Sequence, residues 1–415
     1  MVRSNGIRGR KARSVLFVLV TAATPLQSEQ HDSAQSLESR QVRIGAQAIA
    51  VVTSIDPTPE RRRRTEGYLT QPMASLIARR GSLAARLTLN AEAITLDRGE
   101  LTAGAWGEGF VDRRHPHTFF HEVMLELSRA GHCGGIRCAA GVFAGKGFLP
   151  FGSDDPMSRP FVAYPVNHHL AQILERAVAG AQAGVGPFTL ELALFNGDEP
   201  VDAWEWPRWS RFGDSWAGRL EVVPARGVSL AASYADVTSP EARMGAGPDQ
   251  QKWHVGARGE RSAGAWRLGV LIEWARTEEL DGFFRYDSRL GEGTVERGPH
   301  RVAYRFERSD RPEEERQSDY RTFRPHLDNA VVGISRWTLH TIRYGYRLPW
   351  RRGTAEPFVE ATRGDIEELT GGLFNPEARY GRATVTRLSA GIRLAWAMER
   401  HRMGRYGVHD GPVTH

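Results

Sequence analysis

Three closely spaced histidines are the first candidates for chemistry in this sequence. His115, His117 and His121 all lie within one short stretch, VDRRHPHTFFHE. Imidazole nitrogens, together with a carboxylate, hold zinc or copper at about 2.0–2.2 Å. On a strand that rises about 3.3 Å per residue, His117 and His121 would stand about 13 Å apart and could not share one ion. The sequence therefore predicts His115 and His117 as the metal pair, with a further ligand from elsewhere.

The alternative is that these histidines only form hydrogen bonds, at the mouth of a strand or the base of a loop. Catalytic motifs do not help to decide. The sequence contains no G-x-S-x-G elbow, no Walker loop and no H-E-x-x-H helix. We therefore expect no enzyme activity and no organic cofactor.

The elements that position these residues are strands, because apolar and polar side chains alternate. Phe188, Leu190, Leu192 and Leu194 alternate with wetter residues, which is the period of a two-faced strand. Turn-rich pieces such as GSDDP and NGDEP separate the runs. The clearest further strand candidates are residues 42–56, 82–90, 118–128, 215–223, 227–236, 265–276, 300–309 and 385–396.

The polar faces of these strands carry many charges, which a water-filled lumen tolerates and a packed core does not. The apolar faces include Ala and Gly, which suits contact with lipid, where side chains need not interlock. The sequence predicts these charged residues as pore-lining: Arg86, Arg137, Arg219, Arg267, Arg305, Arg387, Arg393, Glu122, Glu126, Glu191, Glu221, Glu273 and Glu307.

The fold class that follows is all-β, an antiparallel transmembrane β-barrel of about 16 strands, within a range of roughly 14–18. PARG at 224–227 predicts a tight hairpin. Polar stretches at 201–214 and 308–326 predict long loops, so that short turns lie at one end and long loops at the other. Aromatic residues near strand ends predict interfacial girdles: Trp216, Tyr234, Trp266, Trp274 and Trp396.

The N-terminus predicts export. Five basic residues precede the apolar run SVLFVLVTAA, the pattern of a secretory signal peptide over residues 1–28; a disordered basic tail is the alternative. Removing those five charges takes the net charge from +6 to +1 (6 − 5), so the basic balance does not indicate nucleic acid as a partner. The remaining divisions are a disordered segment at 29–41, the barrel at 42–407 and a tail at 408–415.

Cys133 and Cys138 either form a disulfide across a turn or remain free thiols.

Several stretches resemble an uncharacterised porin-like family of bacterial outer-membrane β-barrels. They are VDRRHPHTFFHE, GKGFLPFGSDDPMSRPFVAYPVNHHLAQILERA, FNGDEP, RFGDSWAGRLEV and HRMGRYG. The resemblance implies a β-barrel and names no solute. The stretch from GKGFLPFG to FNGDE is also similar, locally, to phosphate-selective porins. Those porins line the pore with lysine and arginine, whereas the lysines of this chain are only three, Lys11, Lys146 and Lys252.

We therefore expect a porin-like channel in a bacterial outer membrane, surrounded by lipid, through which small hydrophilic solutes diffuse. Seven basic against six acidic pore-lining candidates predict little or weak anion preference. The runner-up is a barrel plugged by its own 201–214 or 308–326 loop, which serves as a structural or binding platform and could hold metal. A third class is a soluble secreted β-protein. The sequence leaves homo-oligomer formation open.

Overall fold

Alternating side chains produce long strands along most of the chain. The computed structural model describes residues 40–58, 61–96, 117–153, 156–166, 168–200, 203–240, 245, 247–315, 330–350, 353–369, 375–397 and 404–406, all within one unit, 39–415. The strands are β1 (Arg40–Asp56), β2 (Arg64–Arg80), β3 (Leu83–Asn90), β4 (Phe120–Cys133), β5 (Ile136–Gly147), β6 (Arg176–Val185), β7 (Phe188–Phe195), β8 (Ser215–Ala225), β9 (Val228–Val237), β10 (Gln250–Ala263), β11 (Trp266–Glu279), β12 (Phe284–Arg297), β13 (His300–Glu315), β14 (Ala330–Tyr346), β15 (Leu348–Trp350), β16 (Gly353–Glu368) and β17 (Thr384–Trp396).

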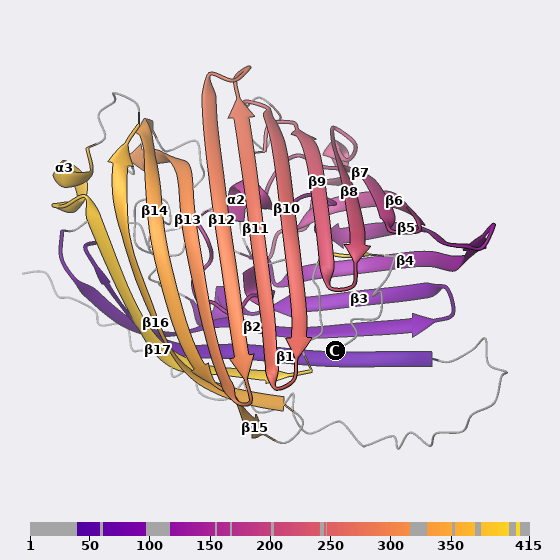
Figure 1. Cartoon of the computed structure of the whole chain (residues 1–415). Helices are drawn as coiled ribbons and strands as arrows, with labels where there is room; N and C mark the ends of the chain where they lie inside the picture. Colours follow the sequence, from indigo (N-terminus) through magenta and orange to yellow (C-terminus); the bar gives the residue numbers. More distant parts are fainter. Residues whose placement is uncertain are drawn as a thin grey trace, which may run out of the picture. The chain divides into compact units, whose positions relative to one another are not determined.

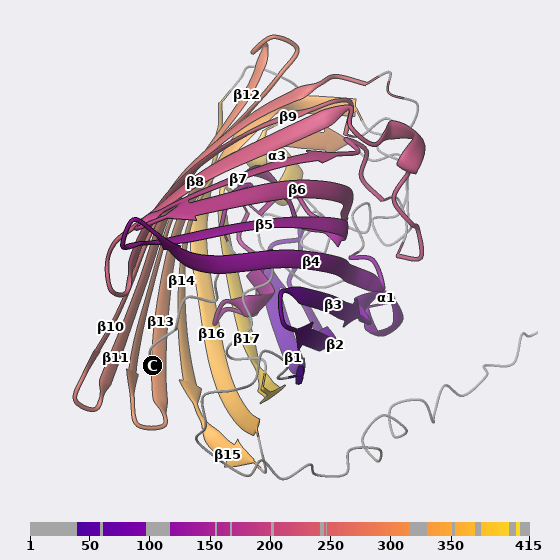
Figure 2. The same cartoon turned by 90° about the vertical axis from the view of Figure 1, so that its right-hand side faces the viewer.

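Each strand from β1 to β13 pairs antiparallel with the next strand in the chain, as do β15 and β16 with theirs, and the sheet closes on itself. The last strand, β17, pairs with β1 over Ala46–Asp56, while β1 also pairs with β2 (Figures 1 and 2). Strands β14 and β15 both pair with β16, so the 17 strands occupy 16 positions around the ring. The predicted antiparallel barrel of about 16 strands is confirmed.

Connections at the two ends of the barrel differ in length, as predicted. Tight turns join β2 to β3, β4 to β5, β6 to β7, β8 to β9, β10 to β11 and β12 to β13, and the longer connections lie at the opposite end. The predicted hairpin turns at Arg226–Gly227. Gly227 has φ +76°, and a Cβ there would lie 2.3 Å from the carbonyl oxygen of Glu260, so this turn requires glycine.

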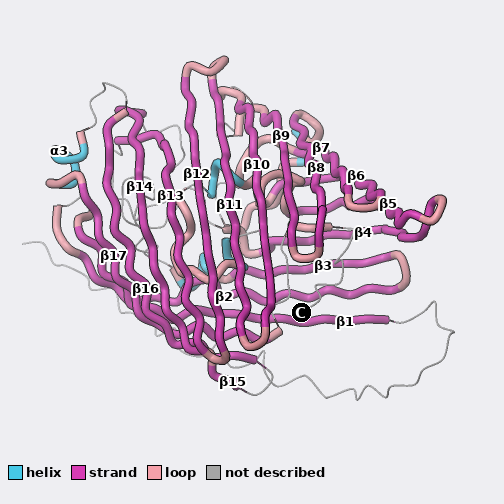
Figure 3. Tube along the Cα trace, viewed as in Figure 1, coloured by secondary structure: helices cyan, strands magenta, loops and turns pink. Residues whose placement is uncertain are grey.

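In the described part of the chain, helical structure is limited to short pieces of the connections (Figure 3). These are α1 (Glu92–Thr95), α2 (His168–Ala171), α3 (Pro376–Tyr380) and single 3-10 turns at Pro156–Ser158 and Trp209–Arg211. Among the described residues, none of these helices has the length and apolarity needed to cross a bilayer.

The outer face of the barrel is apolar. On β11, Trp266, Leu268, Val270 and Ile272 are 44%, 43%, 47% and 59% exposed, whereas the adjacent Glu273 is 2% exposed. Leaving such side chains outside while burying a carboxylate reverses the pattern of a water-soluble protein. A hydrocarbon surround explains it, so the chain is a transmembrane β-barrel.

Aromatic side chains gather near the strand ends on this outer face. Trp216, Tyr234 and Trp253 form a row across β8, β9 and β10, with ring centroids 5.2 and 5.5 Å apart. Trp266 and Trp396 lie at the short-turn end of β11 and β17. These positions fit the girdles predicted from the sequence, since indole and phenol rings prefer the interface between hydrocarbon and water.

The structure corrects several finer predictions. The polar stretch 308–326 is not a loop from its start, because β13 runs to Glu315; residues 316–329 lie outside the described part. The first strand, β1, begins at Arg40, and the last strand, β17, ends at Trp396. The predicted signal peptide and C-terminal tail lie outside the described residues.

The two cysteines form the disulfide that the sequence left open. Cys133 and Cys138 flank the Gly134–Gly135 turn between β4 and β5, with their Cα atoms 5.9 Å apart. The bond therefore closes a single hairpin at the short-turn end of the barrel.

Candidate functional site: the lumen and the segment that crosses it

Strand alternation turns the predicted pore-lining residues toward the inside of the barrel, where most are buried. In each buried member of the set, less than one-tenth of the residue's surface remains exposed. The buried set is Arg86, Arg219, Arg305, Arg387, Arg393, Glu122, Glu126, Glu191, Glu273 and Glu307. Three others are less covered: Arg137 and Arg267 lie one residue from the short turns, and Glu221 is partly exposed beside Arg219.

Part of the chain itself covers these side chains. The connection from β5 to β6 comprises residues 148–175, and its described parts, 148–153, 156–166 and 168–175, lie inside the barrel; we call them the inner segment. Met157, Phe161 and Val162 of this segment are at most 1% exposed. Its helix α2 contacts β11 and β12 from within, and in Figure 1 it is seen behind the wall. The lumen is thus crossed by the 148–175 connection.

Charged side chains of the wall bind the main chain of the inner segment. Arg393 on β17 donates to the carbonyl oxygens of Arg159 and Phe161, at 2.9 and 3.1 Å. Glu360 on β16 accepts from the amide of Val162 at 2.9 Å. These bonds satisfy buried main-chain groups that form no sheet ladder.

Strand β13 adds two more contacts of this kind. Arg305 donates to the carbonyl of Ala163 at 2.8 Å, and Glu307 accepts from the amide of Val166 at 2.7 Å. The guanidinium of Arg305 also lies 4.1 Å from the centre of the Phe161 ring. Together with β16 and β17, β13 forms a charged side of the lumen that grips the segment.

Neighbouring strands β1 and β2, which follow β17 around the ring, and the more distant β9 hold the segment through neutral groups. Gln47 on β1 donates to the carbonyl of Met157 at 3.2 Å, and Gln71 on β2 donates to that of Val162 at 3.1 Å. Near the start of the segment, the amide of Gly152 donates to Ser233 on β9 at 2.9 Å. The inner segment is therefore fixed to the wall on several sides.

The side chain of Arg159 places a positive charge in the middle of the lumen. Its guanidinium lies 3.5 Å from Glu273 on β11 and 3.3 Å from Glu292 on β12. Wall residues pair in the same way; for example, Arg343 donates to Glu356 at 2.7 Å, and Arg387 donates to Glu360. Most of these buried charges therefore lie beside an opposite one, and Arg393, which binds main-chain carbonyls, differs from them.

Residues near the C-terminus also enter the lumen. The hydroxyl of Tyr406 donates to Glu122 on β4 at 2.9 Å and accepts from the amide of Phe148 at 3.0 Å. Arg405 donates to the carbonyl of Gly152 at 3.2 Å. Burial, together with the negative charge of Glu122, raises the pKa of the Tyr406 phenol well above its usual value. Tyr406 therefore stays protonated and links the inner segment to β4.

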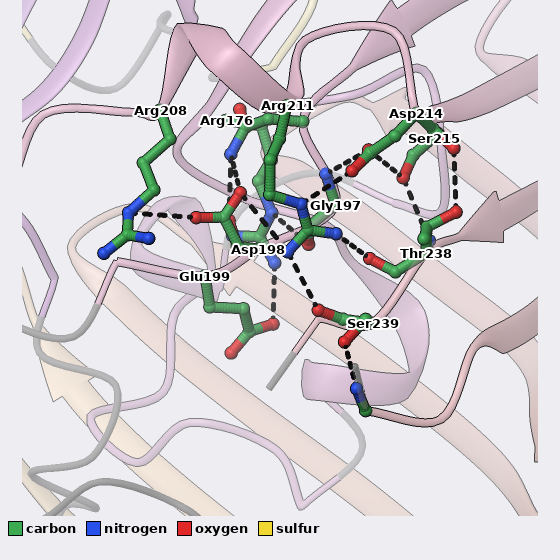
Figure 4. Close-up of polar contacts among 12 residues, drawn as sticks. Arg176, Gly197, Asp198, Glu199, Arg208, Arg211, Asp214, Ser215, Thr238 and Ser239 are labelled. Carbon is green, nitrogen blue, oxygen red and sulfur yellow. Dashed lines mark hydrogen bonds and ion pairs between the residues drawn. The ribbon is translucent and has the colours of Figure 1, made fainter. Parts of the chain in front are cut away.

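The predicted plug loop at 201–214 lies elsewhere. Arg211 donates to the carbonyl of Thr238 beyond β9 at 2.5 Å and to Asp214 at 2.7 Å (Figure 4). Arg176, at the start of β6, donates to Glu199 at 2.8 Å. These contacts hold the described part of the loop, residues 203–214, at the rim next to β6, β8 and β9. The 201–214 loop was therefore the wrong choice, since 148–175 is a described connection that lies inside the barrel, and the greater part of the other predicted loop, 308–326, lies outside the described residues.

A small cavity lies between the inner segment and the wall. Its volume is about 20 Å³, and its lining includes Ser153, Arg219, His254, Arg258 and Arg405. About 10–15 Å³ is enough for one water molecule. This space therefore takes water and no solute.

The histidines lie at the root of the inner segment, where the structure contradicts the predicted spacing. His117 precedes β4 and is not part of it, so strand geometry does not separate it from His121; their ring centroids are 5.2 Å apart. The Nδ1 atoms of His121 and His117 lie 2.5 and 3.6 Å from Glu175 Oε1. His115 lies outside the described residues.

Glu175 is the centre of this cluster. Its two carboxylate oxygens accept from the amide of Thr118, at 2.9 and 3.1 Å. Burial opposes ionisation of Glu175, but hydrogen bonds with His117 and His121 outweigh burial and hold its pKa well below the usual range. Burial likewise opposes the charge on His117, and the bond with Glu175 outweighs it and raises the pKa of His117.

Sequence reasoning missed the residues that bind the inner segment from β16 and the C-terminus. On β16, Glu360 lies on the same buried face as Glu356 and Phe358, and these residues alternate with the exposed Pro357 and Val359, so the period-two rule that found Glu273 also applied there. Tyr406 gave no such signal, because its contacts come from residues 122 and 148.

Comparison with solved structures found outer-membrane channels. An anion-selective porin from Comamonas acidovorans aligns over 86% of this chain and 100% of its own, with 12% identity and a TM-score of 0.49. The channel DcaP of Acinetobacter baumannii aligns over 86% and 97%, with 9% identity and a TM-score of 0.47. A loop-deletion mutant of OmpT from Vibrio cholerae aligns over 86% and 99%, with 11% identity and a TM-score of 0.46.

The chain is similar in fold to outer-membrane porins. No family model matches the sequence, and neither does any curated protein. Identities and scores this low carry no argument about the solute or activity of this chain, so its function must be inferred from its own lumen.

Proposed function

We propose that the chain is a porin-like channel of a bacterial outer membrane, through which small hydrophilic solutes diffuse past the inner segment. One observation carries this proposal: the inner segment is held by charged wall side chains such as Arg393 and Glu360, not by an apolar core alone. Charges facing inward suit a lumen that admits water. A predicted signal peptide and an apolar outer face support export to the outer membrane and contact with its lipid.

The paired charges support weak ion preference. Arg159 lies between Glu273 and Glu292, and Arg343 is bonded to Glu356. An ion that passes these pairs meets partly cancelled fields, since each guanidinium is neutralised by a carboxylate in contact with it. Small neutral solutes and ions of both signs are therefore the expected cargo.

The second candidate is a plugged barrel that acts as a binding platform. It is favoured by the burial of the inward charges, because side chains that line a wide channel would be exposed to water. Glu122 and Glu360, for example, are at most 2% exposed. Under this reading the inner segment would stay in place and the barrel would conduct nothing.

Single-channel recording in planar bilayers tests the two candidates, and Arg393→Met is the most informative variant. It removes two hydrogen bonds to the inner segment. The described hydrogen-bond partners of Arg393 are main-chain carbonyls, so the substitution takes no hydrogen bond away from a carboxylate. The matched control is Arg267→Met, another inward arginine, which lies 3.6 Å from Glu296 near the short turns and is 55% exposed. Folding of each variant is checked by heat-modifiable mobility in SDS gels.

A narrowed channel predicts small, discrete conductance steps for the native chain. Arg393→Met should raise the conductance or open time several-fold, and Arg267→Met should leave both unchanged. If the folded native chain and folded Arg393→Met are both silent, the channel proposal fails and the platform takes its place. A large native conductance that Arg393→Met does not alter would remove the inner segment from the conduction path.

A further inference from the structure

The cluster at the root of the inner segment has the composition of a metal site. His117, His121 and Glu175 each offer one ligand atom, and all three atoms lie within 4.8 Å of one another. Two imidazoles and one carboxylate form a common protein ligand set for zinc, with a fourth position left for water. The three residues come from the approach to β4, from β4 itself and from the end of the inner segment.

The distances between the ligand atoms are close to those that an ion requires. Bonds of about 2.0–2.1 Å in tetrahedral geometry place ligand atoms about 3.4 Å apart. His117 Nδ1 lies 3.6 Å from Glu175 Oε1, near that value. His121 Nδ1 is closer to the same oxygen, at 2.5 Å, because a hydrogen bond joins the two atoms. An ion would replace this hydrogen bond, and the two atoms would separate by less than about 1 Å.

The surroundings already orient the carboxylate. Both oxygens of Glu175 accept from the Thr118 amide, and such second contacts fix a ligand and are a regular part of protein metal sites. The neighbouring cation, Lys146, donates to Thr118 Oγ1 at 2.6 Å, so its ammonium is directed to the hydroxyl. His121 is fully buried, which restricts its ring to this pocket.

We propose that His117, His121 and Glu175 bind a divalent ion of the zinc class, which fastens the end of the inner segment to strand β4. The ion replaces the hydrogen bonds between these residues with coordinate bonds. This inference goes beyond the proposed channel and does not require conduction, because it concerns binding alone.

The test uses the full, untagged chain, folded in detergent and stripped with EDTA. Zinc chloride is titrated against a chromophoric chelator, and cobalt(II) replaces zinc to report tetrahedral coordination by visible absorption. We expect one ion per chain. His117→Gln, His121→Gln and Glu175→Gln should each weaken binding at least tenfold. His254→Gln is the matched control, because His254 is also buried and lies 3.2 Å from Glu273, with no second histidine in its pair.

Each result has a defined meaning. Gel mobility identifies variants that fail to fold, and if buried His121→Gln does so, the less buried His117→Gln decides the test. Native binding no tighter than that of folded His117→Gln overturns the proposal. The proposal is also overturned if His115→Gln loses zinc binding while folded His121→Gln binds zinc as tightly as the native chain. That result assigns the ion to His115 and His117, the pair predicted from the sequence. Because no current is measured, failure here leaves the channel proposal standing, and a silent barrel leaves the metal site standing.

Discussion

The guanidinium of Arg305 on β13 donates a hydrogen bond of 2.8 Å to the main-chain carbonyl of Ala163, in the middle of the inner segment. The same group donates to Glu292 at 2.7 Å and to Glu307 at 3.4 Å. One wall side chain thus holds the segment in place and balances two buried carboxylates. This arrangement ties the position of the inner segment to the charge balance of the lumen.

Arg305→Met should destabilise the barrel strongly. It leaves Glu292 and Glu307 without their common partner, and breaking a buried ion pair from one side costs about 3–5 kcal/mol. The measurement is the temperature at which the folded gel band disappears. Arg305→Met with Glu292→Gln should recover part of the loss, because one of the two carboxylates is neutralised. Equal stability of the single variant and the native chain would contradict this account of the lumen.

Tyr406→Phe should loosen the start of the inner segment. The change removes the hydroxyl's bond to Glu122, which keeps its bond from Thr88, and removes the acceptor of the buried Phe148 amide, which costs about 1–3 kcal/mol for that amide. Hydrogen exchange at the Phe148 amide should therefore become faster. Tyr164→Phe serves as the control, since its hydroxyl bonds Glu92 instead. An unchanged exchange rate in Tyr406→Phe would show that this contact does not hold the segment.

Ile272→Arg should weaken the barrel in detergent or lipid. Ile272 lies midway along β11, points outward and is 59% exposed, so the substitution places a charge in hydrocarbon at about 2–4 kcal/mol. Ile272→Leu should have little effect, because it keeps the surface apolar. Denaturant titration of the folded fraction compares the two. Native-like stability of Ile272→Arg would mean that this face does not contact the membrane core.

Reversal potentials should be small. If the channel conducts, a salt gradient across the bilayer should give a reversal potential near zero or a slight anion preference, because the lumen charges pair with one another. Glu360→Gln should shift the potential toward anions, since Glu360 balances Arg387 and lies 3.9 Å from Arg343. Strong cation selectivity of the native chain would contradict the charge pairing described here.

The histidine cluster illustrates where sequence reasoning failed. Treating residues 117–121 as one strand placed the two imidazoles too far apart, but β4 begins only at Phe120. The turn before the strand brings His117 back toward His121, and Glu175 meets both from the far end of the inner segment. Neither the turn nor Glu175 leaves a periodic signal.

The sequence by itself determined the strands, the closed antiparallel sheet and the outward direction of residues such as Leu268 and Ile272. Those features follow from alternation between neighbouring residues, which is local and therefore readable. Only the tertiary structure decided that residues 148–175 cross the lumen and which charges hold them. Arg393 lies 234 residues from Arg159 in the chain, and Glu360 lies 198 residues from Val162. Such contacts arise only once the barrel closes, because closure brings the inner faces of distant strands around the same segment.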